Sequence, residues 1–189
     1  NAFALPGGSI FISRGFLEKL RDESMLAAVL AHEISHTTAQ HLGQRITRQQ
    51  LVGMIGGIAS STAGNSAGQW LRVGTDIGGG LLLMSYSREQ ELESDYLSFR
   101  YVAKLGYSPK GVLNVLRILE QEAKGAPRSS IFSTHPAPAE RARRAARYIA
   151  GTFPDADDTD RYITNATRYD QVVLQNLQKL PPPRHGASS

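Results

Sequence analysis

The sequence predicts a mainly helical α+β fold, and three observations support this prediction. Residues 9–13 are apolar and β-favouring, and they follow the turn-forming run Pro6-Gly7-Gly8. Much of the remaining chain carries apolar residues at helical spacing. The 189 residues, 41% of them apolar, are enough to bury one packed core. We therefore expect a small β element beside a helical body.

Five main helices are expected along the chain. Asp22 suits the N-cap of the first helix, because its carboxylate can accept a backbone N–H at the positive end of the helix dipole. Gly106 suits the position just after a helix end, and Ser108-Pro109 suits a helix start. The predicted helical segments are residues 25–44, 85–105, 109–124, 138–150 and 169–180.

Composition excludes several kinds of site. The chain has no cysteine, so it can form neither disulfides nor thiolate metal sites. Its net charge is +4, without a long basic run. The densest basic patch lacks interleaved aromatic residues, so we interpret it as a solvated helix face and expect no nucleic-acid partner. This patch comprises Arg141, Arg143, Arg144 and Arg147.

Residues 51–84 differ from the rest of the chain, since they hold nine of its 18 glycines. The two apolar pieces, residues 51–59 and 77–84, are shorter than the roughly 20 residues of a membrane helix, so no membrane span is expected. We expect two closely packed helices or a flap beside a cleft. The chain is expected to divide into a domain over residues 1–150 and a C-terminal extension over residues 151–189, with an acidic loop, one helix and a disordered Pro-rich end.

The stretch from His32 to His36 has the pattern His-Glu-x-x-His inside a predicted helix. Residues four apart share one helix face, so His32 and His36 can aim two imidazoles at one point. Such a pair binds zinc when a third protein ligand is available, and the fourth position is left to water. Glu33 projects beside that point and can take a proton from the water. The pattern therefore predicts a zinc hydrolase, most often a peptidase.

The same five-residue pattern also occurs by chance on ordinary helix surfaces. Here Met25, Leu26, Val29 and Leu30 form an apolar stripe at helical spacing, which predicts a buried helix. Burying this motif without a metal would leave polar groups unpaired, which is costly. We therefore favour the metal site. His41 falls off the ligand face of a continuous helix and is expected to be a surface or packing residue.

A second charged pattern lies at residues 87–95. Glu91 and Asp95 are four residues apart and share a helix face. If Glu91 reaches the metal, Asp95 lies one turn away and can accept the outer N–H of a ligand histidine, which fixes its tautomer. The alternative is a charged face in contact with solvent, which such runs usually are. The spacing alone leaves both interpretations open.

The predicted strand over residues 9–13 also has two interpretations. It is either a plain core strand or an edge strand onto which an extended peptide adds by main-chain hydrogen bonds. In the second case Gly8 allows close approach of the peptide, and Ile10, Phe11 and Ile12 form the docking edge.

Four segments together resemble one protein family. They are Asn1-Ala2-Phe3 with Pro6-Gly7-Gly8 and the strand, the His-Glu-x-x-His helix, Ser-Arg-x-x-Glu-x-x-x-Asp at residues 87–95, and His-Pro-x-x-x-x-Arg at residues 135–141. In this order they look like the catalytic domain of HtpX-like and CAAX-prenyl-protease-like zinc metallopeptidases. Within that family the chain is most similar to the soluble, periplasmic BepA-like peptidases. The resemblance covers roughly residues 1–149.

This resemblance implies a gluzincin-type metallopeptidase fold, mainly helical, with a small β-sheet whose edge strand lines the active-site cleft. It implies one zinc ion per chain, held by His32, His36 and Glu91. Glu33 would be the catalytic base, and Asp95 would be the outer partner of a ligand histidine.

The function implied is a zinc-dependent endopeptidase that acts on unfolded or misassembled proteins in envelope quality control. The expected location is the bacterial periplasm, with any signal peptide or lipoprotein signal outside the chain; the alternative is a peripheral place at a membrane. A helical-repeat or partner domain beyond residue 189 fits the same family. One alternative function is a catalytically quiet, zinc-containing, chaperone-like binding module for outer-membrane proteins, against which the intact Glu33 argues. Another is a zinc hydrolase of non-peptide amides.

His135 lies in a loop, and Pro136 biases its backbone toward an extended shape. It could simply cap a helix end. Two functional roles place it near the metal instead: a ligand in the fourth position that keeps the enzyme latent, or a hydrogen-bond donor to the oxyanion, for which Tyr96 is the other candidate. Both functional roles require Arg141 to anchor the far end of the loop, with an acidic residue of the helix over residues 89–95 as the candidate partner.

Overall fold

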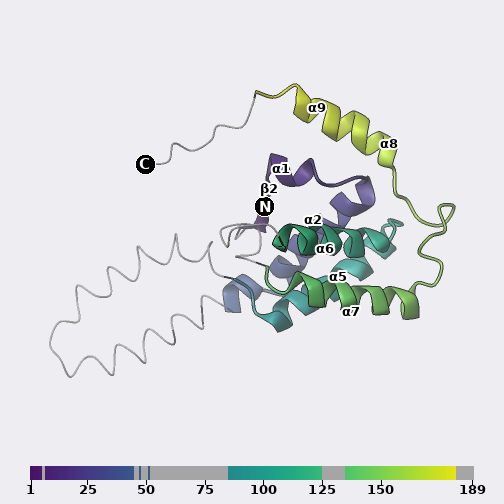
Figure 1. The fold of residues 1–189 in the computed structure, drawn as a ribbon. Helices are drawn as coiled ribbons and strands as arrows, with labels where there is room; N and C mark the ends of the chain where they lie inside the picture. Colours follow the sequence, from purple (N-terminus) through teal and green to yellow (C-terminus); the bar gives the residue numbers. More distant parts are fainter. Residues whose placement is uncertain (6, 45–46, 48–50, 52–84, 125–134, 182–189) are drawn as a thin grey trace, which may run out of the picture.

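The computed structural model describes residues 1–5, 7–44, 47, 51, 85–124 and 135–181. Within these ranges the chain forms a helical body with a two-stranded antiparallel sheet (Figure 1). The expected mainly helical α+β fold is therefore confirmed. The two helices or flap expected over residues 51–84 lie outside the described residues, apart from Leu51.

The sheet is a hairpin at the N-terminus. Strand β1 (Ala2–Ala4) pairs antiparallel with strand β2 (Ile10–Ile12), and Phe3 stacks on Phe11 across the pair with ring centroids 5.3 Å apart. The sequence pattern predicted β2 alone, because the Ala-Phe-Ala run of β1 carries little β propensity. The small side chains of β1 face inward, and the strand packs against the central helix α2 (Glu23–Thr38).

Helix α2 is the central element of the helical body. It packs against α5 (Arg88–Lys104) and α6 (Lys110–Ala123), and the core lies along these contacts. The start of α2 is as predicted, since Asp22 Oδ1 accepts the backbone N–H of Met25 at 3.0 Å. A buried face of small and aliphatic residues allows the neighbouring helices to approach closely. Its core members are Met25, Ala28, Val29 and Ala31.

Helix α2 ends earlier than predicted, at Thr38 instead of near Gln44. Gln40 has a φ of 56°, in the left-handed region that ends a helix and reverses the chain. Residues 41–44 form a separate helical stretch after this turn, and His41 at its start contacts His36.

Helices α5 and α6 begin and end close to their predicted limits. Ser87 caps α5 in a capping box with Gln90, and Gly106, with a φ of 80°, follows its end. The start of α6 approaches the start of α2 so closely that a Cβ on Gly111 would lie 2.3 Å from the backbone oxygen of Ser24. Helix α7 (Pro138–Thr152) covers α6 and begins at the predicted proline.

The last helical segment packs back onto the N-terminal part of the chain. Helix α8 (Ala166–Tyr169), the π-helical η3 (Asp170–Leu174) and α9 (Gln175–Gln178) follow one another, and Figure 1 shows α8 and α9 near α1 (Arg14–Leu17). Tyr169 is fully buried and donates to the carbonyl of Leu17 at 2.8 Å. The division at residue 150 stays a prediction. None of the helices in the described ranges is both long and apolar enough to cross a membrane.

Candidate metal centre

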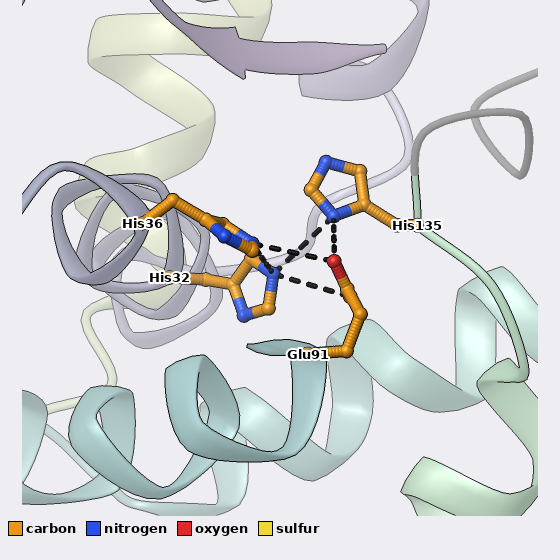
Figure 2. Close-up of side chains that lie close together, drawn as sticks. All are labelled: His32, His36, Glu91 and His135. Atoms are coloured by element: carbon orange, nitrogen blue, oxygen red, sulfur yellow. Dashed lines mark hydrogen bonds and ion pairs between the residues drawn. The ribbon is translucent and has the colours of Figure 1, made fainter. Parts of the chain in front are cut away.

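Four side chains from three parts of the chain meet at one point (Figure 2). His32 and His36 project from one face of α2, as their spacing requires. Glu91 projects from the first turn of α5, and His135 lies just before α7. Each of the four offers one ligand atom, and these atoms lie within 4.8 Å of one another.

The spacing of these atoms suits a tetrahedral metal ion. With bonds of about 2.1 Å, neighbouring ligands of a tetrahedral zinc ion lie about 3.4 Å apart. His32 Nε2 is 3.1 Å from His36 Nε2 and 3.4 Å from His135 Nδ1. Glu91 Oε1 is 3.3 Å from His36 Nε2 and 2.9 Å from His135 Nδ1. The donor set therefore fits a single ion, with His135 as the fourth member.

The chemistry of the donors also favours a cation. A ligating imidazole nitrogen and a carboxylate oxygen each direct a lone pair at the shared centre, and such an arrangement requires a positive charge or protons between them. Three of the four candidate ligands are buried, among them His36 at 1% and Glu91 at 0% exposure. Two neutral imidazoles with a carboxylate are a donor set that zinc accepts readily.

Burial and nearby charge set opposite protonation preferences in the two α2 histidines. Burial acts to lower the pKa of His32, but hydrogen bonds to Asp95 and Glu91 outweigh it and raise the pKa of His32 to about 9. Burial lowers the pKa of His36 to about 3, although a hydrogen bond to Glu91 opposes this shift. His36 therefore favours the neutral form that metal binding requires, whereas His32 would have to release a proton to bind a metal.

Asp95 and Arg141 form a buried ion pair behind the cluster. Asp95 Oδ1 lies 3.1 Å from His32 Nδ1, so it can accept that N–H and leave Nε2 free to ligate. Arg141 donates to both oxygens of Asp95, at 2.7 and 2.6 Å, and its Nη1 contacts Glu91 Oε2. Burial acts to raise the pKa of Asp95, but the charge and hydrogen bonds of Arg141 hold that pKa below its usual value.

The position of Arg141 corrects one expectation. The arginine patch of α7 was predicted to be a solvated face, but Arg141 is only 3% exposed and points to the cluster. The prediction was wrong there because two buried carboxylates, on another helix, compensate the guanidinium. The remaining three arginines of the patch are exposed: Arg143, Arg144 and Arg147.

Glu33 lies beside the four ligand residues and is 2% exposed. Its Oε1 is 3.5 Å from His135 Nε2, and its Oε2 has no hydrogen-bond partner among the described residues. A buried carboxylate oxygen without a partner is costly, so its presence suggests that it serves a water or a substrate. Glu33 is therefore positioned to act on a molecule bound next to the cluster.

Other acidic and aromatic candidates on α5 lie elsewhere. Glu89 and Glu93 are exposed, in contrast to the buried Glu91. Tyr96 is 47% exposed and packs against Tyr148, with ring centroids 5.5 Å apart. The structure thus brings His135, and not Tyr96, into the cluster.

Two residues next to His36 were missed in the sequence. Tyr86 stacks on its ring with centroids 3.6 Å apart. His41 is 1% exposed, and its Nδ1 lies 3.0 Å from His36 Nδ1. His41 is thus a buried neighbour of the cluster: of the two predicted places, surface or packing, the structure shows the second, and its contact with His36 was not predicted. The place of His41 depends on the left-handed turn at Gln40, and no sequence pattern predicts that turn.

The predicted peptide-docking strand β2 contacts α2, and its partner β1 reaches the site. Ala2 of β1 lines a cavity of about 40 Å³ together with His32 and Glu33. Gly8, with a φ of 91°, forms the hairpin turn, a conformation that L side chains rarely adopt. The docking role assigned to Gly8 and to Ile10, Phe11 and Ile12 stays a prediction.

A helical body that carries a His-Glu-x-x-His helix beside a buried carboxylate is an arrangement typical of metallopeptidases. A profile of peptidase family M48 matches residues 1–149. The chain therefore belongs to peptidase family M48, and the resemblance inferred from the motifs is confirmed.

Individual relatives of this chain are also named as proteases. The "Beta-barrel assembly-enhancing protease" of Escherichia coli (strain K12) is 32% identical over 148 residues, which are 75% of this chain and 30% of that protein. "Mitochondrial metalloendopeptidase OMA1" of Schizosaccharomyces pombe is 29% identical over 163 residues, 86% of this chain and 47% of that protein. "Metalloprotease LoiP" of Escherichia coli (strain K12) is 29% identical over 154 residues, 76% of this chain and 56% of that protein. The chain thus matches only about a third to just over a half of the length of these relatives.

Proposed function

We propose that this protein is a zinc-dependent endopeptidase that hydrolyses peptide bonds of unfolded or misassembled proteins. The observation that carries the proposal is the group of four candidate ligand atoms, spaced as around one tetrahedral ion. Beside them lies Glu33 Oε2, which has no hydrogen-bond partner in the part of the chain that the structure describes. Membership of peptidase family M48 supports the peptidase activity. His32, His36 and Glu91 are the proposed permanent ligands.

The mechanism assigns a separate task to each surrounding residue. His32, His36 and Glu91 would hold a zinc ion, which would supply Lewis-acid chemistry: a lower pKa for an attacking water and polarisation of the scissile carbonyl. Glu33 takes the proton of the attacking water and later delivers it to the leaving amine. Asp95 accepts the Nδ1–H of His32 and so keeps Nε2 available, while Arg141 keeps Asp95 ionised in the interior.

We assign His135 the role of a latency plug. Its Nδ1 stands 2.9 Å from Glu91 Oε1 and 3.4 Å from His32 Nε2, where a water ligand would have to bind. Substrate can then reach the metal only after His135 has left. The competing role, a hydrogen bond to the oxyanion, requires His135 to remain close to the metal without ligating it.

The second candidate function is a catalytically quiet binding module that contains zinc. One observation favours it: four protein ligands around one ion are typical of structural zinc sites, whereas catalytic sites keep an open position. Glu33 favours the enzyme, because its buried Oε2 has no hydrogen-bond partner among the described residues, and a structural site gains nothing from such an oxygen.

Cleavage of unfolded casein by the purified protein separates the two functions. We expect cleavage that a zinc chelator abolishes and added zinc restores. Binding of unfolded protein without cleavage, by a zinc-loaded protein and also by a His135→Ala variant, would instead establish the binding module.

We further propose that the substrates belong to the bacterial cell envelope and that the protein acts in the periplasm. The support is the relative named as a protease that enhances β-barrel assembly, since transmembrane β-barrels of bacteria are outer-membrane proteins. Fractionation of cells that express the tagged full-length protein tests the location. Recovery of the protein in the cytoplasmic fraction would refute it.

A further inference from the structure

His41 makes a contact to which the proposed mechanism gives no role. Its Nδ1 lies 3.0 Å from Nδ1 of the proposed ligand His36, and its Nε2 lies 3.2 Å from Glu93 Oε2 on α5. Ser94 Oγ is also 3.4 Å from His41 Nδ1. The side chain is 1% exposed, so the neighbours named here take the place of water.

The orientation of His36 decides which nitrogen carries its proton. Its Nε2 faces the cluster, at 3.1 Å from His32 Nε2 and 3.3 Å from Glu91 Oε1. A metal bound through Nε2 leaves the proton on Nδ1, and this N–H then needs an acceptor. Only a lone pair on His41 Nδ1 can fill that role at 3.0 Å, because two N–H groups cannot face one another.

The carboxylate of Glu93 selects the tautomer of His41 that accepts. A carboxylate can only accept a hydrogen bond, so His41 must carry its proton on Nε2 to donate to Glu93. The proton on Nε2 leaves Nδ1 with a lone pair, directed at His36. His36, His41 and Glu93 therefore form one chain of hydrogen bonds with a single consistent direction.

We propose that His41 is a positioning residue for the metal ligand His36, and that Glu93 sets the tautomer of His41. The proposal rests on the proposed function, since it takes His36 as a zinc ligand. It gives the two α2 ligands different outer partners. His32 has the carboxylate of Asp95, which Arg141 compensates, whereas His36 has a neutral imidazole whose carboxylate partner Glu93 is largely solvated, at 58% side-chain exposure.

This arrangement avoids a further buried carboxylate next to the proposed ligands. Asp95 and Glu91 already share Arg141, and another carboxylate in place of His41 would be desolvated with no cation beside it among the described residues. The imidazole of His41 accepts from His36 and donates to Glu93, whose carboxylate solvent can stabilise. The turn at Gln40 makes this possible, because it brings His41 back onto α2.

The test compares zinc affinity, by competition with a chromophoric chelator, between His41→Leu and His41→Asn. Leucine fills the site but cannot accept a hydrogen bond, whereas the asparagine oxygen can replace the lone pair of Nδ1. We expect His41→Leu to weaken zinc binding about 10- to 100-fold, in line with the loss of other outer partners of metal ligands. We expect His41→Asn to stay within about threefold of the wild type. Equal losses in both variants, or no loss in either, would overturn the proposal.

Two substitutions of exposed glutamates test the proposal without changing a buried side chain. Glu93→Ala removes the partner of His41, and Glu89→Ala removes another exposed carboxylate of α5 that does not contact His41. We expect weaker zinc binding in Glu93→Ala only. Nitrogen NMR of the zinc-loaded wild type should show His41 protonated on Nε2 and His36 on Nδ1. A wild-type protein without zinc affinity would refute the proposed function itself, whereas normal zinc binding with His41 protonated on Nδ1 would refute only this inference.

Discussion

Glu33 stands within the cluster with one oxygen 3.5 Å from His135 Nε2 and the other without a hydrogen-bond partner among the described residues. Replacing it by glutamine keeps the size and the hydrogen-bonding capacity of the side chain but removes the base. We expect Glu33→Gln to retain zinc and to lose peptidase activity by at least about 10²-fold. Metal analysis and casein cleavage on the same sample measure both. A zinc-loaded Glu33→Gln protein with full activity would rule out the proposed mechanism.

His135 allows a sharper test, because its two proposed roles predict opposite changes. As a plug, His135→Ala should raise casein cleavage several-fold and, by loss of a fourth ligand, should weaken zinc binding. As an oxyanion donor, it should lower kcat by about 10²-fold or more. We expect the first result, since His135 Nδ1 lies among the ligand atoms. Arg144→Ala, at an exposed position of α7, is the matched control and should change neither quantity.

At the scale of elements, the geometry of the site depends on how α2 is held by its neighbours. Gly111 allows the start of α6 to touch the start of α2, and a Cβ there would lie 2.3 Å from the backbone oxygen of Ser24. We expect Gly111→Ala to lower the free energy of unfolding by about 1–3 kcal/mol through overpacking. Gly151→Ala on α7 is the control, because a Cβ at that position would meet nothing within 4 Å among the described residues. Equal thermal stability of the two variants would contradict this account of the helix contact.

At the scale of the whole molecule, the proposed ion connects α2, α5 and the segment before α7. An ion that binds only the folded chain adds about 4 kcal/mol when its concentration is 1,000 times Kd. For a domain of this size that corresponds to roughly 8–16 °C in Tm. We therefore expect a chelator to lower Tm by about that amount in calorimetry. A His36→Ala variant should show no such shift, and a wild-type Tm indifferent to chelation would mean that the metal does not connect these elements.

Several features could be predicted because they depend on neighbours in the chain. The spacing of His32 and His36 fixes their common face through helix geometry alone, and the Asp22 cap follows from local hydrogen bonding. Gly106 ends α5 for a similarly local reason, its positive φ. The family resemblance added Glu91 as a candidate ligand. The spacing of Glu91 and Asp95 alone was equally compatible with a charged helix face in contact with solvent.

The sequence by itself thus determined the helical character, the metal-binding motif and the family of this protein. Only the tertiary structure decided what surrounds the motif. Arg141 is buried because Asp95 and Glu91, on another helix, compensate its charge. His135 contacts His32, which lies 103 residues away in the chain, and a left-handed turn at Gln40 precedes the contact of His41 with His36. These positions depend on contacts between distant segments and on a change of chain direction, and no local spacing or propensity encodes either one.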